Sequence, residues 1–392
     1  MASSHPKAKH ESLAELALAI GGLAIGTGEF AAMSLLPEMA HGTHVDIPTA
    51  GHFISSYALG VVVGAPLFAI LGTRVPRRLM LLILMVLFAA GNFLSVAVSS
   101  YWPLMVARFI SGLPHGAYFG VAALVAAALV DHDKRATAVG RVMLGLSVAN
   151  VIGVPLATWM GQALGWRSLF ISVGGLAILT VILVRSFVPK VPTDEDASIK
   201  NELTAFTNLQ LWLTLLAAAI GFGGMFAVYS YISPLLTHVT GVSEAAIPWI
   251  LTVFGIGNIA GTVIGGKAAD KAIRTTILVS FLVSGTAAGL FVFGAHALWS
   301  ALVLLFFVGC TQALAPSIQT HLMDIGKKAQ TLAAALNQSA FNVANANGAW
   351  LGGLAISANL GWTSPGWVGA LLAFGGFVVM GLSFLLEKRR AN

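Results

Sequence analysis

Residues 188–208 read VPKVPTDEDASIKNELTAFTN and form the longest polar interruption in a chain of 392 residues. The chain is 57% hydrophobic and 9% charged, with a mean hydropathy of +0.87, whereas a soluble domain carries about 25% charged residues. Outside the interruption, apolar runs of about 20 residues recur, each long enough to cross a hydrocarbon layer of about 30 Å as a helix. The sequence therefore predicts an all-α polytopic membrane protein with no separate soluble domain.

The apolar runs fall into two sets of six, one on each side of the interruption. Their centres lie near residues 26, 60, 88, 116, 149, 177, 223, 257, 285, 311, 344 and 376. This pattern predicts twelve transmembrane helices in an N-terminal bundle at 1–188, a cytoplasmic linker at 189–208 and a C-terminal bundle at 209–392. The run that begins at Leu13 is too long for a cleaved signal peptide, so we expect it to be the first spanning helix.

The basic residues lie mostly on one side of the predicted membrane. If the first helix starts inside, the loops on the outer side hold Arg167. The inner side holds Lys7, Lys9, Arg74, Arg77, Arg78, Lys134, Arg135, Lys190, Lys200, Lys267, Lys271, Arg274, Lys327, Lys328, Lys388, Arg389 and Arg390. We expect a multi-pass protein of a bacterial inner membrane. The asymmetry of the basic residues puts both termini in the cytoplasm and explains the net charge of +6 without a nucleic-acid partner.

The two sets of helices resemble each other in sequence. AIGTGEF at 24–30 matches AIGFGGMF at 219–226, VANVIG at 148–153 matches VANANG at 343–348, and LGW recurs at 164–166 and 360–362. In the second helix of each set, Gly60 and Gly64 match Gly257 and Gly261. The offset of roughly 195 residues indicates an internal repeat of unchanged orientation, and such repeats place a cavity at their interface near the midplane.

Three motifs give the chain a resemblance to a known family. They are ILGTRVPRR at 70–78, LMVARFISGLPHG at 104–116, and GLSVANVIGVPLATWMG at 145–161 followed by LGWR. Over essentially its whole length the chain resembles the major facilitator superfamily (MFS), and within it the twelve-helix drug:proton antiporter branch. GTGEF at 26–30 with the LLP that follows is similar to the subgroup of chloramphenicol-resistance, arabinose and purine-nucleoside exporters.

The resemblance implies two pseudo-symmetric bundles, proton-driven efflux and a part in multidrug resistance. It implies that an antiporter motif in the fifth helix seals the cavity through Gly145, Gly153, Pro155 and Gly161; the alternative is glycine-mediated helix packing with no role specific to transport. It also implies cytoplasmic gate loops with Arg74, Arg77, Arg78, Asp270, Lys271 and Arg274. The chain departs from the family pattern at Thr73 and Pro76 in the first gate loop, at Ile273 in the second, and at Val154 before Pro155.

Two charges fall well inside the spans of the first half. Glu29 lies about 10 Å below the outer end of the first helix, and Arg108 about 9 Å below the outer end of the fourth. Pairing or mutual facing across one cavity would offset part of the cost of removing each charge from water. We expect Glu29 to exchange protons as the cavity alternates between sides; the alternative is a static ion pair that fixes helix packing.

Further candidates lie on single helix faces. His115 follows Arg108 and Gly112 at i, i+4, i+7 and is expected in the proton relay, or as a neutral hydrogen-bonded histidine. Gln338, Asn342 and Asn345 repeat at the same spacing and predict a polar stripe that binds substrate or joins helices. Aromatic candidates for substrate contact, with plain packing as the alternative, are Tyr57, Phe119, Phe226, Tyr229 and Tyr231.

The sequence lacks a nucleotide-binding loop, a nucleophile triad and metal-ligand spacing, so we expect neither an enzyme nor a cofactor or metal. The predicted function is proton-coupled export of a small organic compound, drug-like, sugar or nucleoside, by a monomer in the lipid bilayer, with Glu29 also in contact with substrate. Two alternatives remain open at this stage. One is a proton-independent facilitator or sugar importer, and the other is a membrane receptor that binds a ligand without transporting it.

Overall fold

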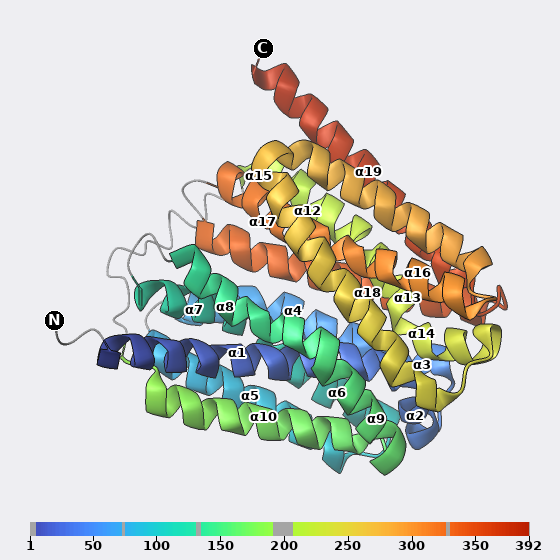
Figure 1. Ribbon diagram of the computed structural model, residues 1–392, viewed down its shortest axis with the longest axis horizontal. Coiled ribbons are helices and arrows are strands. Elements are labelled where there is room, and N and C mark those ends of the chain that lie inside the picture. The colour runs from blue at the N-terminus through green and yellow to red at the C-terminus, as the bar shows by residue number, and fades with distance from the viewer. Residues whose placement is uncertain (1–4, 73–74, 131–134, 191–206, 327–329, 392) are drawn as a thin grey trace.

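In the computed structural model the described residues are 5–72, 75–130, 135–190, 207–326 and 330–391. Nearly all of them lie in helices (Figure 1). The first half consists of α1 (His5–Ser34), α2 (Leu36–Thr43), α3 (Ile47–Ala50), α4 (His52–Leu71), α5 (Arg77–Ala97), α6 (Tyr101–Gly112), α7 (His115–Ala128), α8 (Arg135–Val148), the π-helical turn η3 (Ala149–Gly153), α9 (Val154–Leu164) and α10 (Arg167–Phe187).

The second half repeats this plan. It consists of α12 (Leu209–Gly221), α13 (Gly223–Ser230), α14 (Ile232–Leu235), η5 (Leu236–Thr240), η6 (Glu244–Ala246), α15 (Ile247–Gly294), α16 (Leu298–Gly309), η7 (Cys310–Ala313), α17 (Leu314–Ile325), α18 (Gln330–Ser357) and α19 (Ser364–Ala391). In Figure 1 the blue-to-green half and the yellow-to-red half lie against each other, with α2, α3 and α14 at the end of the molecule away from the chain termini.

The described helices account for twelve membrane crossings. Ten segments are long and apolar enough to span a membrane. One of them, Glu244–Gly294, contains two crossings, because α15 leaves helical geometry at Ala272 (φ −156°, ψ 72°). The twelfth crossing is α18, which is 28 residues long but carries the polar stripe of Gln338, Asn342 and Asn345. The twelve-helix fold predicted from the sequence is confirmed, whereas residues 191–206 of the predicted linker lie outside the described residues.

The two halves pack their second and fourth crossings in the same way. Gly60 of α4 lies so close to α6 that a Cβ would overlap the Phe109 carbonyl oxygen, and Gly257 of α15 lies in the same way on the carbonyl oxygen of Phe306. Gly64 meets the Leu113 carbonyl, and its counterpart Gly261 meets that of Cys310. Each pair of contacts is displaced by 197 residues, so the sequence repeat corresponds to a repeated helix contact that requires a missing side chain.

The fifth crossing contains a wide turn just before Pro155. Pro155 has no N–H group and cannot donate to a carbonyl one turn earlier. The five residues Ala149–Gly153 immediately before Val154 adopt the π-helical turn η3. An extra residue in a helical turn rotates the following side chains relative to those before it. This turn lies where α15 of the other half packs against the fifth crossing.

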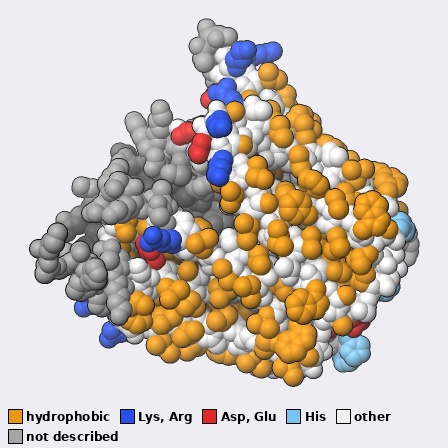
Figure 2. Space-filling view, in the orientation of Figure 1, with side chains coloured by type: hydrophobic (Ala, Val, Ile, Leu, Met, Phe, Trp, Pro, Cys, Tyr) orange, Lys and Arg blue, Asp and Glu red, His pale blue; other side chains and the backbone are white. Residues whose placement is uncertain are grey.

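The surface fits a lipid environment. Figure 2 shows hydrophobic side chains over most of the visible face, with Lys and Arg gathered toward the chain termini and His at the opposite edge. Among the most exposed large apolar residues are Trp102, Trp249 and Trp299, each 72–75% exposed at the first turns of α6, α15 and α16. Tryptophan is enriched at membrane–water interfaces, so these three mark one boundary of the apolar belt.

Replacing Gly64 by alanine should destabilise the protein, because the added Cβ would overlap the Leu113 carbonyl and push α4 away from the fourth crossing. Overpacking of this kind costs about 1–3 kcal/mol. The measurement is the melting temperature of detergent-solubilised protein. Gly120→Ala is the matched control, since Gly120 is also helical but has open space where the Cβ would lie. Equal melting temperatures for the two variants would contradict the close-packing interpretation.

Candidate functional site

Glu29 lies at the contact between the two halves. It is on α1, its side chain is buried, and its Oε1 accepts a hydrogen bond of 2.9 Å from Nδ2 of Asn345 on α18. Asn345 is fully buried as well. Within the described residues the ion pairs are Arg141–Glu15 and Arg274–Glu387, so Glu29 is bonded to an amide of the other half and not directly to Arg108.

Arg108 lies near Glu29 and is held by aromatic rings. It is 1% exposed, and its guanidinium carbon lies 4.4 Å from the ring centroid of Tyr57 and 5.1 Å from that of Phe170. Within the described residues its Nε and Nη1 have no hydrogen-bond partner. The negative faces of the two rings supply part of the electrostatic stabilisation that water would otherwise give. Arg108 also acts on Glu29 through space, which fits the depth that the two residues share.

Tyr57 connects Arg108 to His115. The hydroxyl of Tyr57 on α4 lies 3.1 Å from Nδ1 of His115 on α7, and both side chains are buried. The His115 ring packs edge to face against Phe119 at 5.5 Å. The structure thus brings together Glu29, Arg108, Tyr57 and His115 from four helices of the first half, although they are far apart in the sequence.

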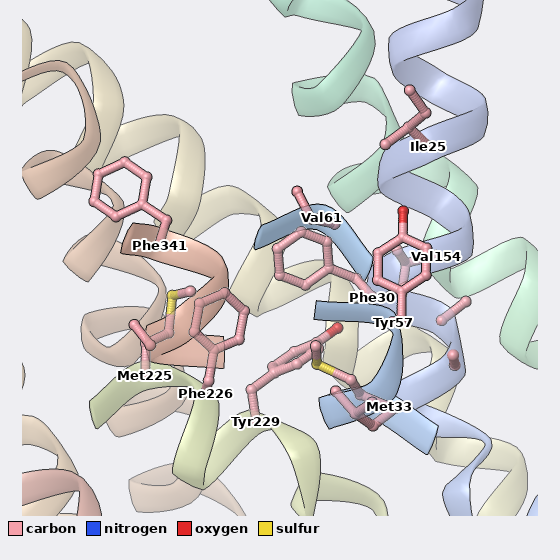
Figure 3. Close-up of a cluster of buried hydrophobic side chains, with 14 of the residues drawn as sticks. Ile25, Phe30, Met33, Tyr57, Val61, Val154, Met225, Phe226, Tyr229 and Phe341 are labelled. Carbon is pink, nitrogen blue, oxygen red and sulfur yellow. The ribbon is translucent and has the colours of Figure 1, made fainter. Parts of the chain in front are cut away.

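A group of aromatic rings adjoins this polar cluster. Phe30, the residue after Glu29, lies 6.3 Å from Phe226, 5.7 Å from Tyr229 and 6.3 Å from Phe254 between ring centroids. Tyr229 and Phe254 stack at 4.0 Å. Figure 3 shows Phe30 between Tyr57 on one side and Phe226 and Tyr229 on the other. The rings come from α1, α13 and α15, so this aromatic group spans both halves.

The predicted amide stripe of α18 faces different partners along its length. Nδ2 of Asn342 donates to the Gln338 carbonyl of its own helix at 2.9 Å, and Asn337 donates to Gln319 of α17 at 2.5 Å. Gln338 is half-buried beside Gly116 of the first half. Of these four amides, Asn345 is the one that bonds to a carboxylate. The residues that helical periodicity placed on one face of α18 therefore have different hydrogen-bond partners.

The glycines of the fifth crossing pack against the first helix. A Cβ at Gly145 would overlap the Ala19 carbonyl of α1, one at Gly153 would meet Thr27, and one at Gly161 would meet Leu35. On another side of this crossing, Gly255 of α15 lies directly on the Asn150 backbone within η3. The crossing thus contacts the helix that carries Glu29 and also the other half.

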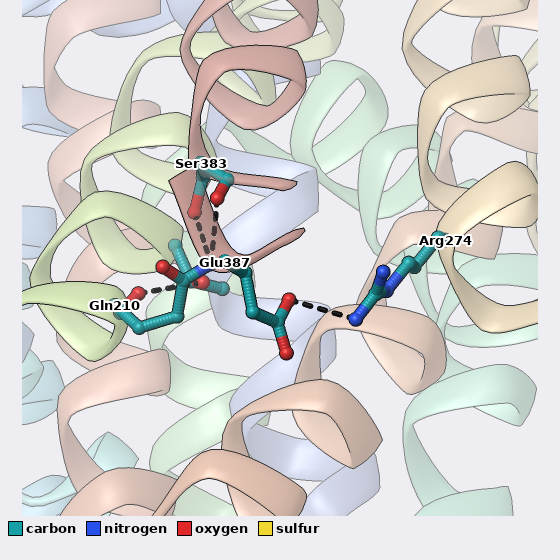
Figure 4. A network of polar contacts seen from close by, with 5 residues as sticks. Gln210, Arg274, Ser383 and Glu387 are labelled. Atoms are coloured by element: carbon teal, nitrogen blue, oxygen red, sulfur yellow. Dashed lines mark hydrogen bonds and ion pairs between the residues drawn. The ribbon is translucent and has the colours of Figure 1, made fainter. Parts of the chain in front are cut away.

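The gate residues lie at the end of the molecule that holds the termini, and two of them have partners there. Arg78 donates to the Arg185 carbonyl. Arg274 forms an ion pair of 3.0 Å with Glu387, and Gln210 bonds to Ser383 one turn away on the same helix (Figure 4). Asp270 and Lys271 are exposed, Arg77 is half-exposed, and Arg74 lies outside the described residues.

Sequence reasoning missed an acidic residue at the opposite end. Glu38 on α2 is half-buried and lies within electrostatic range of Glu244 on η6 of the other half. Beside this pair, Nε2 of Gln162 donates to the Glu244 carbonyl at 3.0 Å and joins the halves. The sequence signal that could have identified Glu38 is its position directly after the first apolar run. We call Glu38, Gln162 and Glu244 the outer seal, where outer denotes only the end of the molecule away from the termini.

Two helical repeats that meet around a buried acid, a buried arginine and a row of amides define a polytopic membrane transporter. The family model of the Major Facilitator Superfamily matches residues 18–241 and 214–392. The chain belongs to this superfamily, as the sequence motifs implied, and is a transporter and not an enzyme.

Individual relatives agree with this assignment. The chain is 38% identical to the inner membrane transport protein YdhP of Escherichia coli over 91% of this chain and 92% of that protein. It is 30% identical to a chloramphenicol resistance protein of Streptomyces lividans over 91% and 92% of the two chains. Its fold is similar to the crystal structure of the nucleoside transporter NupG, with a TM-score of 0.73 at 14% identity, covering 95% of this chain and all of the other.

The outer seal should weaken as the pH rises. Burial, and secondarily the Glu244 carboxylate, raises the pKa of Glu38 to about 7 from an ordinary value of 4.5. Below pH 4.5 Glu38 is neutral whether the seal is closed or hydrated. Between these values only a hydrated Glu38 ionises, so stability of the closed seal is progressively lost as the pH rises toward 7.

The test replaces Cys310 by serine and introduces spin labels at Ala163→Cys and Ala245→Cys, two exposed positions beside the outer seal. Distances between the labels then report closure. At pH 8 Glu38→Gln should raise the ratio of closed to open protein by roughly three- to tenfold over wild type. At pH 4.5, where only half of a hydrated Glu38 is ionised, the two proteins should differ by no more than about twofold. A wild-type ratio at pH 8 as high as that of Glu38→Gln would refute the idea.

Proposed function

We propose that this protein exports a small organic compound in exchange for protons. The observation that carries the proposal is the buried carboxylate of Glu29, which bonds to Asn345 of the other half and lies within reach of the Arg108 charge. An acid inside a membrane protein is costly and marks an ion or proton pathway more often than a packing contact. A carboxylate at the contact between two halves that rock against each other can take up a proton on one side and release it on the other.

The surrounding side chains suit an organic substrate. The aromatic group at Phe30, Phe226, Tyr229 and Phe254 offers flat apolar contact, and the α18 amides offer hydrogen-bond donors and acceptors. In our proposal the substrate contacts Glu29, Tyr57, Phe119, Phe226, Tyr229, Gln338, Asn342 and Asn345. This combination fits a neutral or cationic drug-like compound, a sugar or a nucleoside. The name of the Streptomyces relative supports outward transport, since a transporter that exports an antibiotic would give resistance to it.

Placement in the membrane is part of the proposal. Lys and Arg side chains gather at the end with the termini (Figure 2), which supports a cytoplasmic location of that end by the positive-inside rule. The halves would then be 1–188 and 209–392 around a cytoplasmic linker at 189–208. In this orientation the outer seal faces the periplasm, and the glycines of the fifth crossing keep the first helix close while the halves move. The protein acts as a monomer.

The substrate is found first, by expressing the protein in an exporter-deficient bacterium and scoring tolerance to antibiotics, sugars and nucleosides. A compound that passes this screen is then assayed in proteoliposomes. Uptake of the compound into these proteoliposomes should follow an imposed pH gradient and collapse when an uncoupler is added. Uptake that is indifferent to the uncoupler would show a facilitator, and binding without flux would show a receptor.

Glu29→Gln should abolish uptake driven by the pH gradient, because glutamine cannot release a proton. Exchange of substrate across the membrane at equal pH should persist, since the substitution keeps size and hydrogen bonding. Asp324→Asn is the control, because Asp324 is an exposed acid on α17 away from Glu29, and it should transport as the wild type does. Accumulation by Glu29→Gln at the wild-type level would end the proton-coupling proposal.

A further inference from the structure

Asn345 has an unused hydrogen-bond acceptor at the one point where an amide of the second half reaches Glu29. Its Nδ2 donates to Glu29 Oε1 at 2.9 Å, while its Oδ1 is buried and, within the described residues, has no partner. The side chain is fully removed from solvent. A buried amide oxygen without a donor costs free energy, so an arrangement that supplies a donor to it would be favoured.

A carboxyl group can supply that donor in one of its two states. When ionised, Glu29 only accepts hydrogen bonds and can use Nδ2 of Asn345 but not Oδ1. When protonated, it carries an O–H group that can donate to Oδ1 while its other oxygen still accepts from Nδ2. Asn345 can thus pair fully with the acid but only partly with its anion.

We propose that Asn345 is a positioning residue that couples the proton on Glu29 to the contact between the two halves. With the proton bound, acid and amide join α1 to α18 by two hydrogen bonds and leave neither group unsatisfied. With the proton lost, one bond remains, the Asn345 oxygen is again without a donor, and the carboxylate is better solvated by water that enters when the halves part. This inference rests on the proposed function and specifies how proton binding reaches the bundles.

Asn337 and Asn342 also have a buried side-chain oxygen without a partner among the described residues, but neither of them bonds to a titratable group of the other half. Asn342 donates to its own helix and Asn337 donates to Gln319 of the same half, so neither contact changes when the halves separate. Ser55 and Ser339 also join the halves, at 3.0 Å to the Ala346 carbonyl and 3.4 Å between the Ser339 hydroxyl and the Val62 carbonyl. Those bonds involve no titratable group, and protonation leaves them unchanged.

Few other ionisable groups face Glu29. Of the charged residues on the elements packed against α1, Arg108 acts on it electrostatically, while Arg141 pairs with Glu15 near the start of α1. His115 is bonded to Tyr57, and Tyr118 donates to the Leu18 carbonyl.

Arg167 and Arg185 lie at the two ends of α10, about half the membrane away from Glu29. Tyr229 stacks on Phe254. A pH response that depends on Asn345 would therefore be attributable to Glu29.

The experiment uses the full chain and needs no substrate. Spin labels at Ala163→Cys and Ala245→Cys, with Cys310→Ser, report whether the halves are joined at the outer seal. All proteins carry Glu38→Gln, so that Glu38 contributes no pH response of its own. The ratio of short to long label distances is measured from pH 5 to pH 9 with Asn345 intact and with Asn345→Leu, which removes both the donor and the acceptor.

With Asn345 intact, lowering the pH should raise the ratio of short to long distances by roughly three- to tenfold, the contribution of one hydrogen bond. Asn345→Leu should make this response smaller, because the second hydrogen bond of the protonated pair is lost while the cost of burying the ionised Glu29 remains. Asn92→Leu is the matched control, because Asn92 is equally buried but donates to Phe88 of its own helix at 2.8 Å, and its pH response should remain. A response that survives Asn345→Leu unchanged, or that is absent with Asn345 intact, would overturn the inference.

If Asn345→Leu does not fold, a second variant tests the inference. Asn345→Asp keeps the shape of the side chain but places two carboxyls side by side, and such a pair holds one proton more tightly than a single carboxyl does. The pH at which the halves part should therefore move upward by a unit or more. A purely structural role predicts no such movement, and an unmoved midpoint would count against the inference.

The two proposals fail in different ways. If Glu29→Gln still accumulates substrate in response to a pH gradient, proton coupling itself is lost. If Glu29→Gln cannot accumulate substrate but Asn345→Leu keeps the pH response of the label distances, Glu29 binds the proton and Asn345 does not couple it to the halves. In the distance assay Glu29→Gln should give the low-pH ratio at every pH, because a glutamine amide can pair with Asn345 as the protonated acid does.

Discussion

A charged side chain inside a hydrocarbon layer has no water around it, and the centre of this protein is arranged around that constraint. Arg108 is solvated by the faces of Tyr57 and Phe170, and Glu29 by an amide that comes from the other half of the chain. Neither group could be buried in one bundle without these partners. The position of the two halves and the solvation of the acid therefore depend on each other.

Close backbone contact within each half allows this arrangement. Where α4 meets the fourth crossing, and where the first part of α15 meets the tenth, glycine replaces a side chain so that one helix lies directly on the carbonyls of its neighbour. Glycines in the fifth crossing likewise allow close contact between that crossing and α1. Each half is thus a tightly packed unit, which suits a mechanism in which the halves move as bodies while their mutual contacts change.

The contacts between the halves are of a different kind. Apart from the close contact of Gly255 with the Asn150 backbone, they include isolated hydrogen bonds, such as those of Gln162, Ser55 and Asn345, and aromatic rings that need no fixed partner. Each of these bonds contributes little by itself, so several can be exchanged without a large barrier. Two of the places where halves meet carry acids, Glu29 in the centre and Glu38 at the outer seal. Proton concentration can therefore act on this interface more than on the interior of either half.

The sequence by itself determined the membrane-spanning fold, the twelve crossings, the internal repeat and the two buried charges of the first half. These are local properties. Each can be read from one segment without knowing which helices pack against it: the length of an apolar run, the side on which basic residues lie, and the depth of a charge along a helix. The equal depth of Glu29 and Arg108 placed them near each other correctly, but it could not show that they do not pair directly.

Only the tertiary structure decided which partner each polar group has. Helical periodicity placed Gln338, Asn342 and Asn345 on one face, yet only contact with the opposite half distinguishes Asn345, which reaches Glu29, from Asn342, which bonds to its own helix. The proximity of Glu38 to Glu244 likewise joins residues about 200 positions apart, beyond any local pattern. Pairing across the two halves depends on how the bundles are docked, and that is a property of the packed molecule and not of any segment in it.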